Sequence, residues 1–214
     1  MQNLPLTKRL YEETKSAHAQ IESMPFILNL RDQKLSQNEY TQYLADLKHV
    51  YAALEDGLRK NLEIPAIKAL YDDKLSRTKM LDADLKSFQA EGAIPTDASQ
   101  DYARHLEALS GQTPLLLLAH AYLRYMGDLS GGRMMKKSVE QLFPGDHTAF
   151  YNFDELLGEK ALGAKFVEYK NAWKGRLDGF HFSAEEQSAL IEEAQKGFEY
   201  AGRMFNSYRK DLKD

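Results

Sequence analysis

The apolar residues of this chain recur with the spacing of an α-helix along most of its length. From Tyr43 to Leu58 they fall every three or four residues, which places them on one face of a helix. The tetrapeptide Ser36–Glu39 forms a capping box directly before this run, and Ser183–Glu186 forms another before an equally periodic segment. Both halves of the chain therefore contain strong signals for the start of a helix.

Signals for β-structure are missing from the sequence. No segment alternates apolar and polar residues over the length of a strand, and no Asn-Gly pair marks a hairpin. The sequence therefore predicts an all-α protein, and its 214 residues fit one domain spanning 1–214. With typical helices of about 10–14 residues, such a chain has room for roughly seven or eight of them.

The composition limits the kind of site that the chain can carry. Hydrophobic residues make up 43% and charged residues 28%, which is typical of a soluble globular protein with a sizeable core. Cysteine is absent, which excludes a disulfide scaffold, a thiolate zinc site, an iron–sulfur cluster and a cysteine nucleophile. A chain without cysteine also fits the reducing cytoplasm, where we expect this protein to reside.

Charge and hydropathy exclude two further classes of partner. The net charge is −4 and no long basic run is present, so we expect no nucleic-acid binding. The longest aliphatic run, Leu115–Ala119, is far shorter than the roughly 20 residues of a membrane span. Residues 1–15 lack the apolar core of a signal peptide. We therefore expect a soluble protein with no membrane anchor.

One segment breaks the ordinary rules for a helix. Residues Pro114–Lys137 have helical periodicity but contain Gly127, Gly131 and Gly132. Each glycine inside a helix costs about 0.5–1 kcal/mol relative to alanine, so a helix that keeps three of them has a use for bare backbone. One interpretation is a kinked helix that faces a flat ligand. The other is a helix that ends at Gly127 and runs into a polar turn, and the spacing alone favours neither.

The residues around these glycines resemble a known family. The stretch Leu118–Gly132, which reads LAHAYLRYMGDLSGG, is similar to the signature of the heme oxygenases. The segments Thr14–Glu22, His49–Glu55 and Ile191–Ala194 resemble the family's proximal helix, its next helix and its last helix. The resemblance implies an all-helical, single-domain fold in which heme lies between a proximal helix and a kinked distal helix.

The resemblance also implies a reaction. Heme oxygenases use heme b as both cofactor and substrate, together with O2 and electrons from an external donor. They open the ring to biliverdin and release ferrous iron and carbon monoxide. We expect attack at the alpha meso carbon. The sequence leaves open whether the product serves iron acquisition or pigment synthesis.

Six histidines compete for the role of iron ligand, and a helical histidine is more often a hydrogen-bonding core residue than a ligand. The resemblance selects His18, which lies at the family's proximal position. Lys15 and Glu22 share its helix face, and Glu22 is placed to accept a hydrogen bond, directly or through water, from the ring nitrogen that faces away from the iron. His120 lies inside the signature, but the matching family residue is not the ligand, so we interpret it as structural.

The resemblance places four residues on the distal side of the heme. Asp128 matches the carboxylate that delivers a proton through ordered water. Arg124, Tyr51 and Tyr102 match the hydrogen-bond network that supports this carboxylate. Ala201 stands where an asparagine is often found, so part of the network is missing or rebuilt.

Other residues match contacts with the heme itself. Gly127 and Gly131 match the bare backbone that approaches the ligand, and Phe198 belongs to the last helix of the family. The two propionates need a basic rim, which Lys15, Tyr122 and Lys170 match; the alignment at Lys170 requires a gap of one residue. Tyr11 stands where the family has a further lysine, so one charge contact is lost or replaced by a hydroxyl.

Basic residues cluster in two segments of this acidic chain. Each of them taken singly is equally well explained as part of a solvated helix face. Together they form a surface that suits an acidic electron donor such as a ferredoxin, a flavodoxin or a flavin reductase domain. The residues are Arg133, Lys136, Lys137, Lys165, Lys170, Lys174 and Arg176.

Two other all-helical classes fail on their required residues. A di-iron bundle needs Glu-x-x-His on two helices, and the chain offers only Asp46-x-x-His49 and Asp178-x-x-His181. Thiamin-degrading enzymes share the heme oxygenase-like fold but need a cysteine nucleophile, which is absent.

Two alternatives to the enzyme remain. The first is a heme-binding carrier or sensor that kept the fold and lost turnover, and Asp128 with the unbroken glycine run argues against it. The second is a helical interaction domain without a cofactor. Adding hemin and recording a visible spectrum separates the second from the others, and adding a reductant separates the enzyme from the carrier.

Overall fold

We describe the protein from a computed structural model, which covers residues 4–158 and 163–208, apart from the side chain of Arg133. Within these residues every regular element is helical, so the prediction of an all-α fold is confirmed. Three short 3-10 turns, Asp73–Leu75, Pro114–Leu116 and Ala149–Tyr151, join the helices. The α-helices are α1 (Leu6–Glu22), α2 (Pro25–Arg31), α3 (Gln37–Lys60), α4 (Pro65–Leu70), α5 (Thr78–Ser87), α6 (Asp97–Gln112), α7 (Leu117–Leu142), α8 (Asp154–Leu157), α9 (Gly163–Asp178) and α10 (Ala184–Ser207).

The described residues contain ten α-helices, more than the seven or eight expected. The difference comes from α2, α4 and α8, whose 7, 6 and 4 residues are too few to show a helical period. The long helices begin where the sequence predicts, because the capping boxes at Ser36 and Ser183 start α3 and α10. In both, the serine hydroxyl accepts a hydrogen bond from the backbone of the glutamate three residues later.

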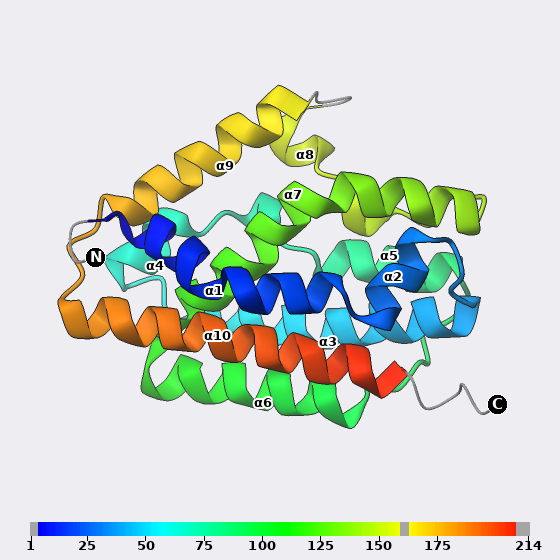
Figure 1. Cartoon of the computed structure of the whole chain (residues 1–214), viewed down its shortest axis with the longest axis horizontal. Coiled ribbons are helices and arrows are strands. Elements are labelled where there is room, and N and C mark those ends of the chain that lie inside the picture. The colour runs from blue at the N-terminus through cyan, green and yellow to red at the C-terminus, as the bar shows by residue number, and fades with distance from the viewer. Residues whose placement is uncertain (1–3, 159–162, 209–214) are drawn as a thin grey trace.

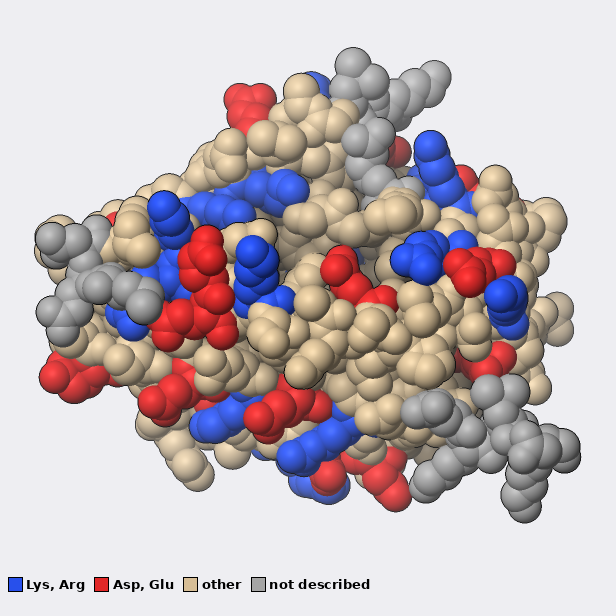
Figure 2. Space-filling model, in the orientation of Figure 1, with Lys and Arg blue, Asp and Glu red and all other residues tan. Residues whose placement is uncertain are grey.

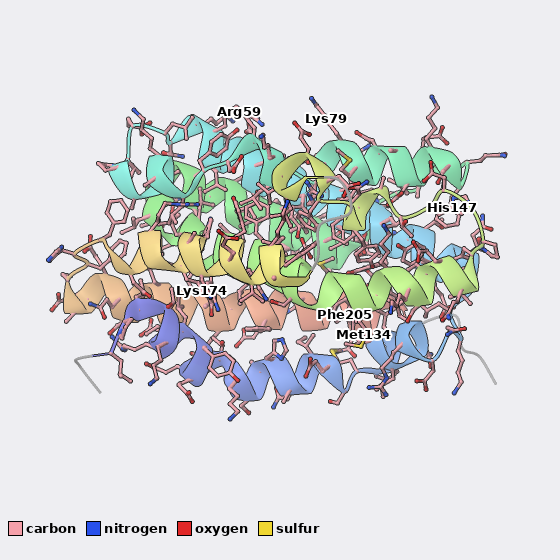
Figure 3. All side chains as sticks on the ribbon, turned by 90° about the horizontal axis from the view of Figure 1, so that it is seen from above. Arg59, Lys79, Met134, His147, Lys174 and Phe205 are labelled. Carbon is pink, nitrogen blue, oxygen red and sulfur yellow. The ribbon has the colours of Figure 1, made fainter. Side chains whose placement is uncertain are left out.

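The long helices pack in pairs around one core. α3 lies against α6 and α5, while α1 and α10 run side by side. Figure 1 shows α1 crossing the front of the molecule between α7 and α10. In the view from above, side chains fill the space between the helices (Figure 3). Leu44, Leu54 and Leu106 are almost completely buried, and Phe205 of α10 stacks on Phe26 with 5.4 Å between ring centroids.

α7 is the longest helix, with 26 residues, and it contains all three glycines of the signature. The helix continues through Gly127, so the alternative of a helix that ends there is wrong. Figure 1 shows the first part of α7 rising steeply in the view, and the second part turning to run horizontally above α5. Neither α7 nor any other described helix has the combination of length and apolarity that crossing a membrane requires.

Asp46 of α3 holds three separate parts of the fold together. Its buried carboxylate accepts hydrogen bonds from the Thr96 backbone at 2.7 Å, the Ser99 hydroxyl at 2.9 Å and the Tyr208 hydroxyl at 2.8 Å. Thr96 is the N-cap of α6, and Tyr208 follows α10. With these donors around it, Asp46 serves a structural role, not the metal-binding one that Asp46-x-x-His49 would need in a di-iron bundle.

Asp178, at the end of α9, fixes the start of α1. Its two carboxylate oxygens accept hydrogen bonds from the Thr7 backbone at 2.8 Å and from the Thr7 hydroxyl at 2.6 Å. The first backbone N–H groups of a helix have no partner within the helix, so this carboxylate satisfies one of them and stabilises the helix dipole. The contact ties α9 to the helix that contains His18.

We expect Asp46→Ala to lower the free energy of unfolding by about 2–4 kcal/mol, because it leaves several buried donors without a partner. Asp56→Ala on the same helix is the matched control. Asp56 is half exposed and, among the described residues, pairs only with Lys60, so its loss should change stability by less than about 1 kcal/mol. Urea unfolding followed by circular dichroism measures both, and equal effects of the two substitutions would contradict the role of Asp46.

Candidate functional site

His18 lies on an accessible face of α1. Its side chain is 57% exposed, and its Nδ1 lies 3.5 Å from the Glu22 carboxylate one turn later. The ring meets Phe198 of α10 edge-on, with 5.9 Å between centroids. Glu22 therefore engages one ring nitrogen, while Nε2 has no hydrogen bond to any described residue. The structure thus brings together His18, Glu22 and Phe198, three of the residues that the sequence predicts for the site.

The glycines of α7 face two different environments. A Cβ placed on Gly127 or Gly131 would meet no atom within 4 Å, whereas one on Gly132 would approach the Tyr151 ring to 3.3 Å. Gly132 therefore allows close packing in the core. Gly127 and Gly131 line open space, where the bare backbone of α7 is accessible to a ligand.

Asp128 lies on α7 between these two glycines and accepts a hydrogen bond from the Tyr51 hydroxyl of α3. Burial raises the pKa of Asp128 to about 6, while the Tyr51 hydrogen bond and the charges of Arg124 and Arg77 oppose the shift. Burial also raises the pKa of Tyr51 well above its usual value, so its hydroxyl stays protonated and is the donor in this hydrogen bond. The result is a carboxyl group that titrates near neutral pH.

Arg124 and Tyr102 form the second part of the predicted distal group. The Arg124 guanidinium lies over the Tyr102 ring, 5.3 Å from its centroid. Burial lowers the pKa of Arg124, but the nearby Tyr102, Tyr51 and Tyr43 hydroxyls have a larger, opposite effect. The pKa of Arg124 is therefore raised overall. Tyr102 is fully buried, and its hydroxyl bonds His120 Nδ1 at 2.8 Å. The structure therefore joins the four predicted distal residues as two contacting pairs, with the positive charge of Arg124 acting on Asp128.

The residues predicted for a propionate rim are more spread out. Lys170 of α9 donates a hydrogen bond to the Ser130 hydroxyl of α7 at 2.9 Å. Tyr122 is buried, with Lys174 Nζ 5.9 Å from its ring centroid, and burial raises its pKa to about 12. Lys15 is exposed on α1. Figure 2 shows basic side chains gathered over α9, next to acidic side chains over α1.

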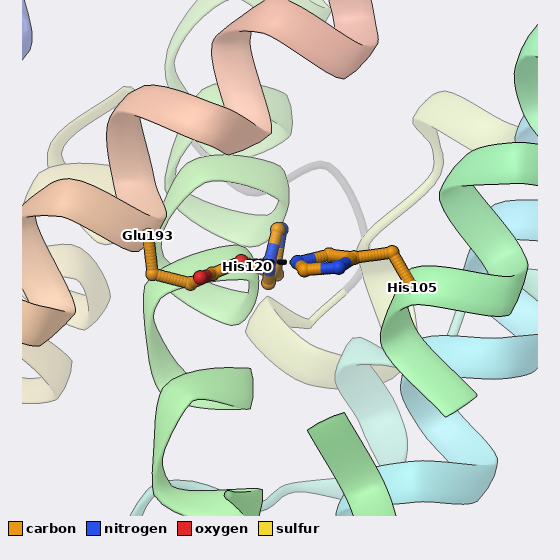
Figure 4. A group of neighbouring side chains, drawn as sticks. All are labelled: His105, His120 and Glu193. Atoms are coloured by element: carbon orange, nitrogen blue, oxygen red, sulfur yellow. Dashed lines mark hydrogen bonds and ion pairs between the residues drawn. The ribbon is translucent and has the colours of Figure 1, made fainter. Parts of the chain in front are cut away.

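The sequence did not reveal the partner of His120. Its Nε2 bonds Glu193 of α10 at 2.9 Å, and His105 of α6 bonds the same carboxylate oxygen (Figure 4). Burial opposes the ionisation of Glu193, but the hydrogen bonds from His120 and His105 outweigh it and hold its pKa at about 2. One signal was available: Glu193 interrupts the apolar face of α10, three residues after Leu190.

Comparison with known proteins places the chain in a family. The model of the family described as heme oxygenase matches residues 4–207. A heme oxygenase from Rhodella violacea is 30% identical, over 97% of this chain and 88% of that protein.

Solved structures give the same result. Heme oxygenase-2 from Synechocystis sp. PCC 6803, in complex with heme and NO, superposes with a TM-score of 0.90 at 27% identity, covering 96% of this chain and 85% of that one. Heme oxygenase-1 from the same cyanobacterium, in complex with heme, gives a TM-score of 0.88 at 26% identity, covering 98% and 94%.

We expect Tyr51→Phe to raise the pKa of Asp128 above about 6, by up to about one unit. The substitution removes a hydrogen bond that stabilises the ionised carboxylate. The pH titration of the carboxyl carbon signal by NMR in the heme-free protein measures this shift. A pKa above that of the unfolded chain also means that Asp128 destabilises the fold as pH rises from about 4 to about 6, with no further change above that range. Tyr11→Phe, an exposed tyrosine on α1, is the control, and an equal shift in both variants would contradict the assignment.

Proposed function

The chain belongs to the heme oxygenase family, whose members degrade heme, and on that premise we propose that it opens heme to biliverdin with release of ferrous iron and carbon monoxide. The observation that best supports this reaction is the position of Asp128. A carboxyl group with a pKa of about 6 lies between two glycines whose side of α7 is open, so a proton donor and a ligand surface occur on the same helix.

We propose that His18 is the protein ligand of the heme iron. Its ring is exposed, and no described residue bonds its Nε2. The Glu22 carboxylate lies next to Nδ1, which is the arrangement that orients a ligating histidine and raises its basicity. Phe198 limits the rotation of the ring from the side of α10. Bound heme supplies the iron that activates O2 and is also the substrate that is consumed.

We propose that α7 covers the other face of the heme, where Gly127 and Gly131 allow its backbone to come close to the flat ligand. We propose that Lys15, Lys170 and Tyr122 receive the two propionates. Lys170 already reaches across from α9 to Ser130 of α7, so a propionate competes with a single neutral hydroxyl for its ammonium group. An ammonium group prefers a carboxylate to a hydroxyl as its partner, and this preference favours binding.

We propose that Asp128 supplies the proton that the oxidation needs, through an intervening water. At a pKa of about 6, a small fraction of the carboxyl groups is protonated at neutral pH. Asp128 can therefore release a proton and take one back at a small cost in free energy. Tyr51 orients the carboxyl group, and Arg124, held over Tyr102, limits how far its pKa rises. A carrier or sensor, the alternative on the same fold, has no use for a tuned acid at this position.

We also propose a class of electron donor and a cellular compartment. The basic residues of α9 include the exposed Lys165 and Arg176 and the half-buried Lys174. Figure 2 shows basic side chains gathered on this face of the molecule. This surface suits an acidic ferredoxin, flavodoxin or flavin reductase that docks close to the heme edge. We propose that the protein acts in the reducing cytoplasm, as one domain.

We expect His18→Ala to leave the fold intact, because the side chain is exposed, and to give a heme complex with an altered axial ligand and little turnover. Added imidazole should partly restore both properties by occupying the space of the lost ring. Visible spectra of the heme complex and reductant-driven turnover measure this, with His181→Ala, an exposed histidine outside the site, as the control. An unchanged spectrum and unchanged turnover in His18→Ala would remove His18 from the role of ligand.

We expect Asp128→Asn to change heme affinity little and to slow biliverdin formation by about 10²–10⁴-fold, the usual contribution of a positioned proton donor. Heme titration followed by reductant-driven turnover, with the product identified by absorbance, separates binding from chemistry. Glu140→Gln removes the same charge from an exposed position of α7 and should leave the rate unchanged. Biliverdin formed by Asp128→Asn at the wild-type rate would show that Asp128 is not the donor.

A further inference from the structure

Three side chains that ligate metals in other proteins converge inside the helical bundle, and the proposed heme chemistry uses none of them as a ligand. His105 comes from α6, His120 from α7 and Glu193 from α10 (Figure 4). His120 Nε2 lies 2.9 Å from Glu193 Oε1, and His105 Nε2 bonds the same oxygen. One ligand atom from each residue lies within 4.8 Å of the other two, so a single small ion can contact all three after a slight outward movement.

We propose that His105, His120 and Glu193 bind a divalent transition-metal ion, at a site separate from His18 and the heme. Two imidazole nitrogens and one carboxylate oxygen are the donor set that suits Zn²⁺, Fe²⁺ and Co²⁺ and does not suit Mg²⁺ or Ca²⁺. Water occupies the remaining coordination positions. The inference does not depend on the proposed function, because none of the three ligands is assigned to heme.

The protonation states of these residues are already those of ligands. The two histidine hydrogen bonds hold the pKa of Glu193 at about 2 against the effect of burial, so its carboxylate is ionised at neutral pH. Burial lowers the pKa of His120, so its ring is neutral. An ion that binds Nε2 of a neutral ring only moves the ring proton to Nδ1, and no proton has to leave the protein.

The surroundings of His120 match those of a metal-ligating histidine. An ionised carboxylate only accepts hydrogen bonds, so His120 Nε2–H donates to Glu193, and Nδ1 accepts from the Tyr102 hydroxyl at 2.8 Å. With an ion on Nε2, the Nδ1–H instead donates to the Tyr102 oxygen, the type of second contact that orients most ligating histidines. Tyr200 stacks on the His105 ring with 5.0 Å between centroids and holds it in place.

The cluster has a path to solvent and also a charge that opposes a cation. The His105 side chain is 21% exposed, whereas those of His120 and Glu193 are almost completely buried, so an ion enters past His105. Lys196 Nζ lies 3.1 Å from the second Glu193 oxygen, Oε2, on a side chain that is 53% exposed. Oε1 therefore stays available to an ion, but the positive charge of Lys196 lowers the affinity for it.

The test is a calorimetric titration of the untagged, heme-free full chain with Zn²⁺ at pH 7.5. We expect saturable binding of one ion. His105→Phe keeps the ring that stacks on Tyr200 but removes the nitrogen ligand, and it should weaken binding by at least about tenfold. Lys196→Met removes the opposing charge and should tighten binding by about thirtyfold, the effect expected for a unit charge roughly 4 Å from a divalent ion in water.

Two matched controls address the other exposed histidines. His181→Ala and His18→Ala should bind Zn²⁺ as the wild-type chain does, since neither residue belongs to the cluster. Absence of binding in the wild-type chain would overturn the proposal. So would binding that survives His105→Phe, or binding that is lost in His18→Ala, because the ion would then lie at the exposed pair of His18 and Glu22.

A spectroscopic measurement on the wild-type chain keeps the proposal testable if His105→Phe does not fold. Co²⁺ bound to histidine nitrogen has visible absorption bands, which can be seen because the chain is free of heme. NMR of the imidazole nitrogens then identifies the ligands, and we expect Zn²⁺ to shift the Nε2 signals of His105 and His120. Unchanged signals for both residues at saturating Zn²⁺ would overturn the proposal.

Discussion

The site depends on a single constraint, the continuity of α7 through a segment that contains three glycines. Because the helix does not end at Gly127, the side chain of Asp128 remains in helical register and reaches Tyr51 of α3. The same continuity leaves the backbone at Gly127 and Gly131 open while Gly132 packs against Tyr151. A helix that ended at Gly127 would lose the proposed proton donor and the proposed ligand surface together.

Two carboxylates link helices that lie far apart in the chain. Asp46 joins α3 to the start of α6 and to Tyr208, and Asp178 joins α9 to the start of α1. Asp46 is buried and Asp178 partly buried, and a carboxylate removed from water needs hydrogen-bond donors, so each of these contacts favours a particular arrangement of helices. The hydrogen bonds between Asp178 and Thr7 fix the start of α1, the helix that contains His18, while the rest of α1 packs against α10.

Asp128 and Glu193 show how the number of donors decides the chemistry of a buried carboxyl group. Asp128 receives one hydrogen bond, from Tyr51, and burial raises its pKa to about 6. Glu193 receives hydrogen bonds from His105 and His120 and a contact from Lys196, and its pKa is held at about 2. The first can give up and take back a proton near neutral pH, whereas the second remains an anion that is suited to bind a cation.

The sequence by itself determined the helical class and the starts of α3 and α10, because these follow from local spacing and residue type. Its resemblance to a family predicted roles for Asp128 and His18. The sequence did not decide whether α7 continues beyond Gly127, because three glycines are compatible both with a helix that bends and with a helix that ends. Only the tertiary structure decided that the helix continues, that Gly132 faces the core, and that Glu193 meets two histidines from other helices. Such contacts join residues that are far apart in the chain, so no local pattern encodes them.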